Sequence, residues 1–217
     1  TLFVGKVYYH FDELSSTNDY AAELIATPSR WKALSGAAKS KPPEGLVIQA
    51  DSQSAGRGQF GSRWQSAAGK NLTFSVVLYP TWLEIPAQFY LSMAMALALC
   101  DTVGLYGGEV STQTAVKWPN DLYFGDRKAA GILIQNPLSG QYIQACIAGI
   151  GLNVNQLEFN SSLANPTSMA HIFGRDFDLK DVAERLFECL ERRYLQLKSG
   201  QRSAIKAEYE QHLYRLG

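Results

Sequence analysis

The glycine-rich stretch GRGQFG, at residues 56–61, carries the clearest chemical signal in the sequence. Its glycines let backbone N–H groups approach an anion closely, and Arg57 and Arg63 add charge-assisted hydrogen-bond donors. Trp64 offers a flat apolar surface for a base or another ring. The match to the dinucleotide motif G-x-G-x-x-G carries little weight, because a turn and a strand follow where that motif needs a helix. An exposed turn with solvated arginines explains the same composition, so both interpretations stay open.

Two later stretches place cations beside predicted strand ends. VKWPNDLYF, at residues 116–124, puts Lys117, Asn120 and Asp121 around a proline. The strand RKAAGILIQ then begins with Lys128, and its small residues leave room for a ligand against a sheet. Loops at strand ends often hold catalytic groups, which favours a functional interpretation. A Pro-Asn-Asp turn with surface lysines, and small residues that admit a packed helix, are the structural alternatives.

Two further stretches could bind a polar ring. SSTND, at residues 15–19, reads as a helix cap whose hydroxyl and amide groups are also available to a ligand. GIGLNVN, at residues 149–155, ends an apolar strand with glycines and asparagines. It is either a tight strand exit or a place where backbone and amide groups meet a polar ligand. None of the four stretches decides the function alone.

The composition excludes several classes of protein. Among 217 residues, 20 basic side chains balance 20 acidic ones, so no net field favours nucleic acid or an anionic membrane. The apolar run at residues 89–100 is too short to cross a bilayer and suits a buried helix. The N-terminus lacks the features of a signal peptide. The cysteines and histidines are too scattered for a disulfide framework or a metal site, which indicates a reducing, cytoplasmic location: Cys100, Cys146, Cys189, His10, His171 and His212.

The elements that would hold these stretches alternate between strands and helices. Hydrophobic periodicity and turn residues predict strands at residues 6–13, 45–51, 71–80, 115–118 with 123–124, 130–135 and 142–154. They predict helices at residues 19–26, 86–106, 179–197 and 203–213, and a mobile surface connection at residues 27–45. No internal repeat is present. The pattern predicts one α+β domain over residues 1–217, with a mixed, largely antiparallel sheet backed by helices.

Taken in order, SSTN, QSAGRGQFGSRW, KWPNDLYFGDRKAAGIL and GIGLNVN closely resemble the catalytic domain of biotin–protein ligases. The resemblance runs from about residue 7 to the C-terminal helices, and lipoate ligases are the nearest relatives in fold. It implies a mixed sheet with helices on one side, distantly akin to class II aminoacyl-tRNA synthetases. Many members carry a small C-terminal β-barrel domain, which we do not expect in this chain. No helix-turn-helix pattern precedes the motifs, so we expect no DNA binding.

The family's activity is the ATP-dependent conversion of biotin to biotinyl-5'-AMP, with Mg²⁺ on the phosphates. The biotinyl group then passes to a lysine of a biotin carboxyl carrier protein or domain. The resemblance implies that the catalytic residues are Arg57, Lys117, Asp121 and Lys128. It implies that the biotin-binding residues are Ser16, Thr17, Asn18, Gln53, Gly56, Arg57, Gly58, Gln59, Lys128, Gly149 and Gly151. The implied ATP-binding residues are Arg57, Arg63, Trp64, Lys117, Asn120 and Asn153.

Some points stay open. Asp121 is a candidate base or orienting group for the acceptor amine, or a contact for Mg²⁺ or the ribose; we expect no protein-only metal site. Gln59 stands where many members carry an arginine, so one contact to the ligand carboxylate or phosphate is in doubt. We expect the loop around Arg57 to be disordered when empty and to close on the ligand. We expect no membrane partner, and a homodimer remains open.

Overall fold

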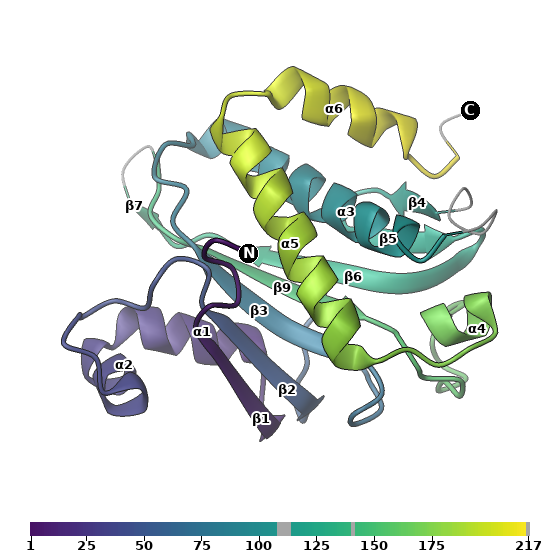
Figure 1. Cartoon of the computed structure of the whole chain (residues 1–217), viewed down its shortest axis with the longest axis horizontal. Coiled ribbons are helices and arrows are strands. Elements are labelled where there is room, and N and C mark those ends of the chain that lie inside the picture. The colour runs from purple at the N-terminus through teal and green to yellow at the C-terminus, as the bar shows by residue number, and fades with distance from the viewer. Residues whose placement is uncertain (108–113, 140–141, 216–217) are drawn as a thin grey trace.

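The computed structural model describes residues 1–107, 114–139 and 142–215. Within these residues seven strands form one sheet, in the order β1-β2-β3-β9-β6-β5-β4 (Figure 1). They are β1 (Tyr8–Leu14), β2 (Val47–Gln53), β3 (Leu72–Leu78), β4 (Thr114–Lys117), β5 (Asp121–Phe124), β6 (Arg127–Gln135) and β9 (Cys146–Leu152). The short strands β7 (Leu138–Ser139) and β8 (Tyr142–Ile143) pair with each other. The helices are α1 (Thr17–Ala26), α2 (Pro28–Ser35), α3 (Phe89–Gly104), α4 (Met169–Phe173), α5 (Leu179–Lys198) and α6 (Arg202–Gln211), with short 3₁₀ turns η1 (Gln59–Gly61) and η2 (Ile85–Ala87).

The pairing of the strands confirms the predicted α+β fold. β1 and β2 run parallel, and the other neighbouring pairs of the described sheet run antiparallel. A register shift in the β5–β6 pair falls between Leu122 and Tyr123, next to the Pro-Asn-Asp stretch. Such irregularities bend a strand locally and redirect its side chains. The mixed sheet is therefore irregular beside one of the stretches singled out in the sequence.

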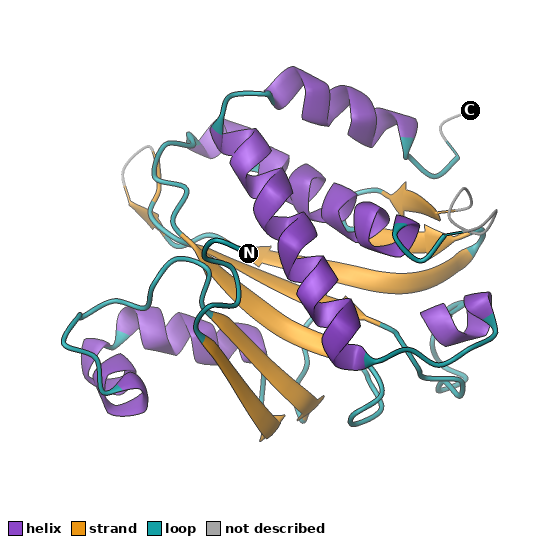
Figure 2. Ribbon diagram, viewed as in Figure 1, coloured by secondary structure: helices purple, strands orange, loops and turns teal. Residues whose placement is uncertain are grey.

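Helices cover both faces of the sheet. Successive residues of a strand point to opposite sides, so the neighbours Phe74 and Ser75 show what covers each face. On one face, Phe74 of β3 packs edge to face against Phe187 of α5, with ring centroids 5.3 Å apart. On the other face, Ser75 hydrogen-bonds to Thr17 and Asn18 at the start of α1. Figure 2 shows α5 crossing the sheet on the first face. The expectation of helices on one side is therefore wrong.

The segment predicted to be a mobile connection, residues 27–45, contains the helix α2. Proline stands at its first turn, and its C-cap Gly36 adopts the left-handed conformation with φ 64°. Trp31 is only 3% exposed and packs edge to face on Tyr9, with ring centroids 6.4 Å apart. This tertiary contact stabilises a helix that the Pro-, Ser- and Gly-rich composition did not suggest.

The apolar helix α3 lies in the core. Together with η2 it forms the segment Ile85–Gly104, which is long and apolar enough to cross a membrane by length and composition alone, although the shorter run at residues 89–100 is not. Sixty-one per cent of an apolar 18-residue stretch within this segment is buried, and α3 packs against α5 and the strands β4 to β6. These contacts are those of the central helix of a folded core.

Candidate active site

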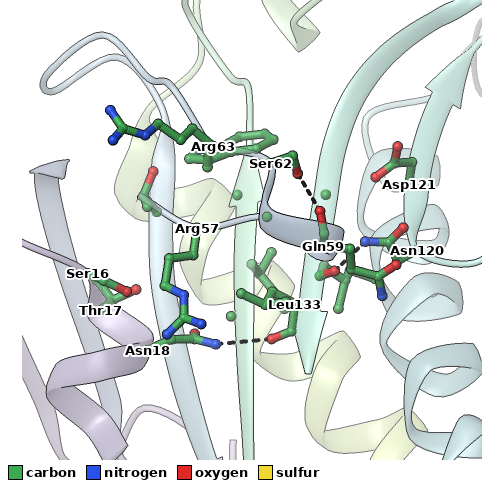
Figure 3. Close-up of a pocket in the computed structure, with 18 of the residues that line it drawn as sticks. Ser16, Thr17, Asn18, Arg57, Gln59, Ser62, Arg63, Asn120, Asp121 and Leu133 are labelled. Atoms are coloured by element: carbon green, nitrogen blue, oxygen red, sulfur yellow. Dashed lines mark hydrogen bonds between the residues drawn. The ribbon is translucent and has the colours of Figure 1, made fainter. Parts of the chain in front are cut away.

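A cavity of about 290 Å³ lies where the start of α1, the glycine-rich loop and the strands β6 and β9 meet. It brings together most of the residues selected from the sequence, although they are far apart along the chain (Figure 3). Those that line it are Ser16, Thr17, Asn18, Gln53, Arg57, Gly58, Gln59, Arg63, Trp64, Asn120, Asp121, Lys128, Gly149 and Gly151. Its volume lies near the lower end of the range for small-molecule sites.

The start of α1 supplies a buried polar wall. The Ser16 hydroxyl caps the helix by accepting a hydrogen bond from the Asp19 amide. The Thr17 amide donates to Gln53 Oε1 at 2.7 Å. The Asn18 amide group donates to the Leu133 carbonyl at 3.2 Å, and its oxygen accepts from Ser75 Oγ at 2.6 Å. These bonds fix the side chains that a polar ring would meet.

Glycines in β9 make room for two side chains that lie flat on the strand. A Cβ atom at Gly149 would stand 2.1 Å from Asn18 Oδ1. A Cβ atom at Gly151 would stand 2.2 Å from Cε2 of Trp64. Contacts below 3.0 Å are not tolerated, so glycine is required at both positions for Asn18 and Trp64 to lie where they do. The two glycines thus shape the floor of the cavity.

The glycine-rich loop folds back on itself as a tight hairpin over the cavity. The Gly58 amide donates to the Ser62 carbonyl at 2.8 Å, and the Trp64 amide donates to the Gly56 carbonyl at 3.0 Å. Phe60, at the tip, is 97% exposed and has a φ of 53°, which is rare outside glycine. Backbone hydrogen bonds across its base hold this loop over the cavity.

Cationic groups reach the cavity from two sides. Arg57 extends toward the start of α1 (Figure 3), where it pairs with Asp19 at 2.6 Å. Lys128 Nζ lies 2.7 Å from Asp121 Oδ1 and 5.9 Å from the centroid of the Trp64 ring. Asp121 Oδ1 has no hydrogen-bond partner among the described residues, and its contact with Lys128 is an ion pair. Both cations are held by carboxylates and remain partly exposed to an incoming anion.

Several polar atoms around the cavity are buried without a hydrogen-bond partner among the described residues. They are Trp64 Nε1, Thr73 Oγ1 and Gln59 Oε1. Each such atom costs about 1–3 kcal/mol if nothing pairs with it. A polar ligand that offers both donors and acceptors would satisfy them. The cavity is therefore built for a hydrogen-bonding ligand rather than for a purely apolar one.

Three of the selected residues lie outside the cavity lining. Lys117 donates to the Tyr123 hydroxyl at 3.2 Å and lies 5.0 Å from that ring. Asn153 is buried and donates to the Thr167 carbonyl at 2.9 Å. Gly56 is buried, and a Cβ there would stand 2.5 Å from the Trp64 carbonyl oxygen. Lys117 would have to leave Tyr123 to reach a phosphate.

Other lining residues were not selected from the sequence. Gly131 and Trp118 belong to stretches that were recognised, whereas Thr73 lies in the apolar strand β3. Ser75 does not line the cavity but fixes Thr17 and Asn18, at 2.8 and 2.6 Å. A polar residue inside the run LTFSVVL is the one sequence signal that could have pointed to β3.

Mg²⁺ would have little to bind here without a nucleotide. No group of three or more His, Cys, Asp or Glu side chains that could hold a metal occurs in the described part of the chain. Asp121 is the one carboxylate among the described lining residues, and Lys128 already neutralises it. The residues fit a Mg²⁺ ion held mainly by phosphate oxygens, with Asp121 as the available protein oxygen.

A comparison with protein families identifies the class of protein to which this fold and this cavity belong. The model of the biotin/lipoate A/B protein ligase family matches residues 21–153. This match covers more than half of the chain. The chain therefore belongs to the biotin/lipoate A/B protein ligase family.

Individual relatives point in the same direction. The chain is 30% identical to the bifunctional ligase/repressor BirA of Bacillus subtilis, over all of this chain and 62% of the relative. It is 29% identical to the biotin--[acetyl-CoA-carboxylase] ligase of Mycobacterium tuberculosis, over 98% of this chain and 74% of the relative. A solved structure of the biotin protein ligase from Aquifex aeolicus, in complex with biotin and ATP, superposes with a TM-score of 0.76 and 26% identity, covering 98% of this chain and 80% of that one. The chain thus spans less than two thirds of the Bacillus relative's length.

Proposed function

We propose that this protein activates biotin with ATP to biotinyl-5'-AMP and transfers the biotinyl group to a lysine of a biotin carboxyl carrier protein. The observation that carries the proposal is the convergence of Arg57, Lys128 and Asp121 with the Asn18 and Trp64 side chains on one cavity. The similarity to a biotin--[acetyl-CoA-carboxylase] ligase and to a biotin protein ligase in complex with biotin and ATP supports biotin as the substrate. A cytoplasmic location and a single catalytic domain over residues 1–217 remain predictions.

In the proposed binding mode, the biotin ureido ring lies against the start of α1. Thr17, Asn18 and Gln53 provide donors and acceptors there, and Trp64 covers the ring system over Gly151. A buried ureido group needs its two N–H groups and its carbonyl paired, because each unpaired group costs about 1–3 kcal/mol. This requirement favours a wall whose side chains are already fixed by their neighbours.

In the first step, a biotin carboxylate oxygen attacks the α-phosphorus of ATP, and the bond to the β-phosphate breaks to release pyrophosphate. The attack brings two anions together, so the main task of the site is to neutralise charge and hold the reactants in line. In our proposal Lys128 and Arg57 do this, while Asn120 and Arg63 contact the nucleotide. In our proposal Lys117 swings from Tyr123 to the phosphates, and Mg²⁺ supplies further charge neutralisation when bound with ATP.

In the second step, the acceptor lysine amine attacks the acyl carbon of the adenylate, and AMP leaves with the bonding electrons. The amine, with an ordinary pKa near 10.4, must first lose a proton. Asp121 is the nearest lining carboxylate and is our candidate for orienting the amine or accepting that proton. Its pairing with Lys128 also links the two steps, because a ligand that draws Lys128 away frees Asp121.

Biotin-dependent exchange of radiolabelled pyrophosphate into ATP tests the proposal directly. We expect exchange with biotin but not with lipoate, and biotin incorporation when an acceptor domain is added. Exchange that responds to lipoate alone would identify a lipoate ligase of the same family. Biotin binding without any exchange would indicate a binding protein that does not catalyse the reaction.

A further inference from the structure

A second hollow, of about 990 Å³, lies beyond the C-terminal end of α1. We call it the α2 groove and define it by Tyr9, Trp31, Lys32, residues 37–43 and Tyr79. Aromatic rings from β1, α2 and the end of β3 form its floor, and the chain between α2 and β2 forms its rim. The mechanism proposed above uses none of these residues.

Among the described lining residues of the α2 groove, the buried side-chain polar atom without a hydrogen-bond partner is a donor. Trp31 is 3% exposed, yet its Nε1 has no hydrogen-bond acceptor among the described residues. The Tyr79 hydroxyl is already used, since it donates to the Pro42 carbonyl at 2.9 Å. No carboxylate occurs among the described lining residues, and the neighbouring Glu44 accepts hydrogen bonds from the Tyr79 amide and the Tyr194 hydroxyl. The groove therefore suits an acceptor-rich, anionic partner.

Charge is distributed unevenly around this groove. The whole chain has a formal net charge of zero, but residues 28–43 contain four basic residues and no acidic one. Of these, Arg30 pairs with Glu23, whereas the lysines of the groove form no ion pair with any described residue. These lysines, all exposed, are Lys32, Lys39 and Lys41. Unpaired surface cations around an apolar floor are complementary to a segment that carries several carboxylates and an apolar side chain.

We propose that the α2 groove docks an acidic segment of the acceptor protein during biotin transfer, an inference that rests on the function proposed above. The groove lies on the same face of the sheet as the cavity, because α1 connects the two and covers that face. The ten residues of α1 separate them by roughly 15 Å. A carrier domain of about 100 residues has a radius of gyration of roughly 13 Å, so one domain can contact the groove and still present a lysine to the cavity.

Exposed lysines spread along the rim suit several carboxylates of a protein segment better than one small anion. Such rim charges mainly accelerate encounter and weaken with salt. The groove should therefore influence the KM for the acceptor protein and leave adenylate formation unchanged. This difference separates a docking surface from a second catalytic element.

The test compares two charge-matched triple variants in the biotinylation of a purified biotin carboxyl carrier domain. One variant carries Lys32→Gln, Lys39→Gln and Lys41→Gln. The control carries Lys180→Gln, Lys198→Gln and Lys206→Gln, which remove the same charge from exposed positions on α5 and α6. We expect the KM for the carrier domain to rise roughly tenfold in the groove variant at low ionic strength and to match the parent at high salt. The control variant should stay within about twofold of the parent.

Biotin-dependent pyrophosphate exchange, measured on the same samples, should be equal in all three proteins. An unchanged KM for the carrier domain in the groove variant would overturn the proposal, and so would an equal rise in the control. A parallel rise in the KM for biotin would also overturn it, because the lysines would then act on the cavity. Absence of exchange in the parent would instead refute the proposed function itself.

Discussion

Partly buried charges occur on both faces of the sheet, and they differ in how completely they are paired. On the α5 face, Arg193 donates to both Asp101 oxygens at 2.7 and 2.8 Å and to both Glu208 oxygens at 2.5 and 2.6 Å. On the α1 face, Arg57 and Lys128 each meet one carboxylate, and polar atoms nearby lack partners among the described residues. The first arrangement ties α3, α5 and α6 together, whereas the second is left incomplete for a ligand.

The pKa of Asp101, in the cluster on the α5 face, reflects this complete pairing. Burial alone would raise the pKa of Asp101, but hydrogen bonds from Arg193 and Arg192 outweigh it and leave the pKa lowered. The hydrogen bonds to Asp101 also raise the pKa of Arg193, so the Arg193–Asp101 pair stays ionised throughout the physiological range. A charge cluster whose hydrogen bonds are all made within the protein contributes to stability, whereas an incompletely paired one contributes to ligand binding. The variants below test this division.

The largest effect on stability is expected from Arg193→Ala, which leaves Asp101 and Glu208 facing each other without a cation. We expect a loss of about 3 kcal/mol in the free energy of unfolding, at the lower end for a broken buried pair because Glu208 is partly exposed. Urea denaturation measures this. Arg185→Ala, which removes an exposed pair with Asp181, is the matched control and should change stability little. Equal losses of unfolding free energy in the two variants would contradict a stabilising role for the Arg193 cluster.

Lys128→Ala should lower the activity strongly and change the stability little, the opposite of what we expect for Arg193→Ala. It removes one of the cations that meet the carboxylate and phosphates, so the rate of pyrophosphate exchange should fall by roughly 10²–10³-fold, equivalent to about 3–4 kcal/mol. The melting temperature should change little, because Lys128 is partly exposed and pairs with a single carboxylate. Exchange at the parent rate would remove Lys128 from the proposed mechanism.

Gly151→Ala tests the floor of the cavity. Its Cβ would stand 2.2 Å from the Trp64 ring, which must move, so we expect biotin to bind about tenfold more weakly. Isothermal titration calorimetry measures the change. Gly104→Ala is the control, because nothing lies within 4 Å of its Cβ position. If both variants bound biotin as the parent does, Trp64 would not define the site.

Asp101→Asn should give the smallest effect, and one that depends on pH. The folded state lowers the pKa of Asp101 below its ordinary value of 3.8, so the ionised group stabilises the protein at neutral pH. That stabilisation is present above the unfolded pKa and is lost as the pH falls through the folded pKa. The variant should therefore be less stable than the parent by about 1 kcal/mol at pH 7, with the difference shrinking below about pH 4. A difference independent of pH would assign the effect to packing.

Much of the fold could be predicted from the sequence, because the periodic segments are long and apolar. The helix at residues 179–197 is α5, and the strands around the glycine-rich loop are β2 and β3. α2 could not be predicted, since burial of Trp31 against Tyr9 stabilises it and no local pattern encodes that contact. Helices on both faces were also missed, because the resemblance implied helices on one side, whereas α1 and α5 pack on opposite faces.

The candidate site was only partly predictable for a similar reason. Motifs indicated that Gly149 and Gly151 belong to it, but not that Asn18 and Trp64 occupy the space these glycines leave. Such contacts join residues more than 80 positions apart. Lys117 and Lys128 looked equivalent in sequence, yet Tyr123 holds the first outside the cavity lining and Asp121 holds the second within it. The direction of a side chain at a strand end depends on such partners.

Hydrogen–deuterium exchange with a non-hydrolysable biotinyl-adenylate analogue tests the central claim most directly. If the cavity binds the adenylate, amides of residues 54–63 and of β9 should exchange more slowly with the analogue, while those of α3, α5 and α6 should not change. Identical exchange at residues 54–63 with and without the analogue, at a concentration that saturates binding, would contradict the account.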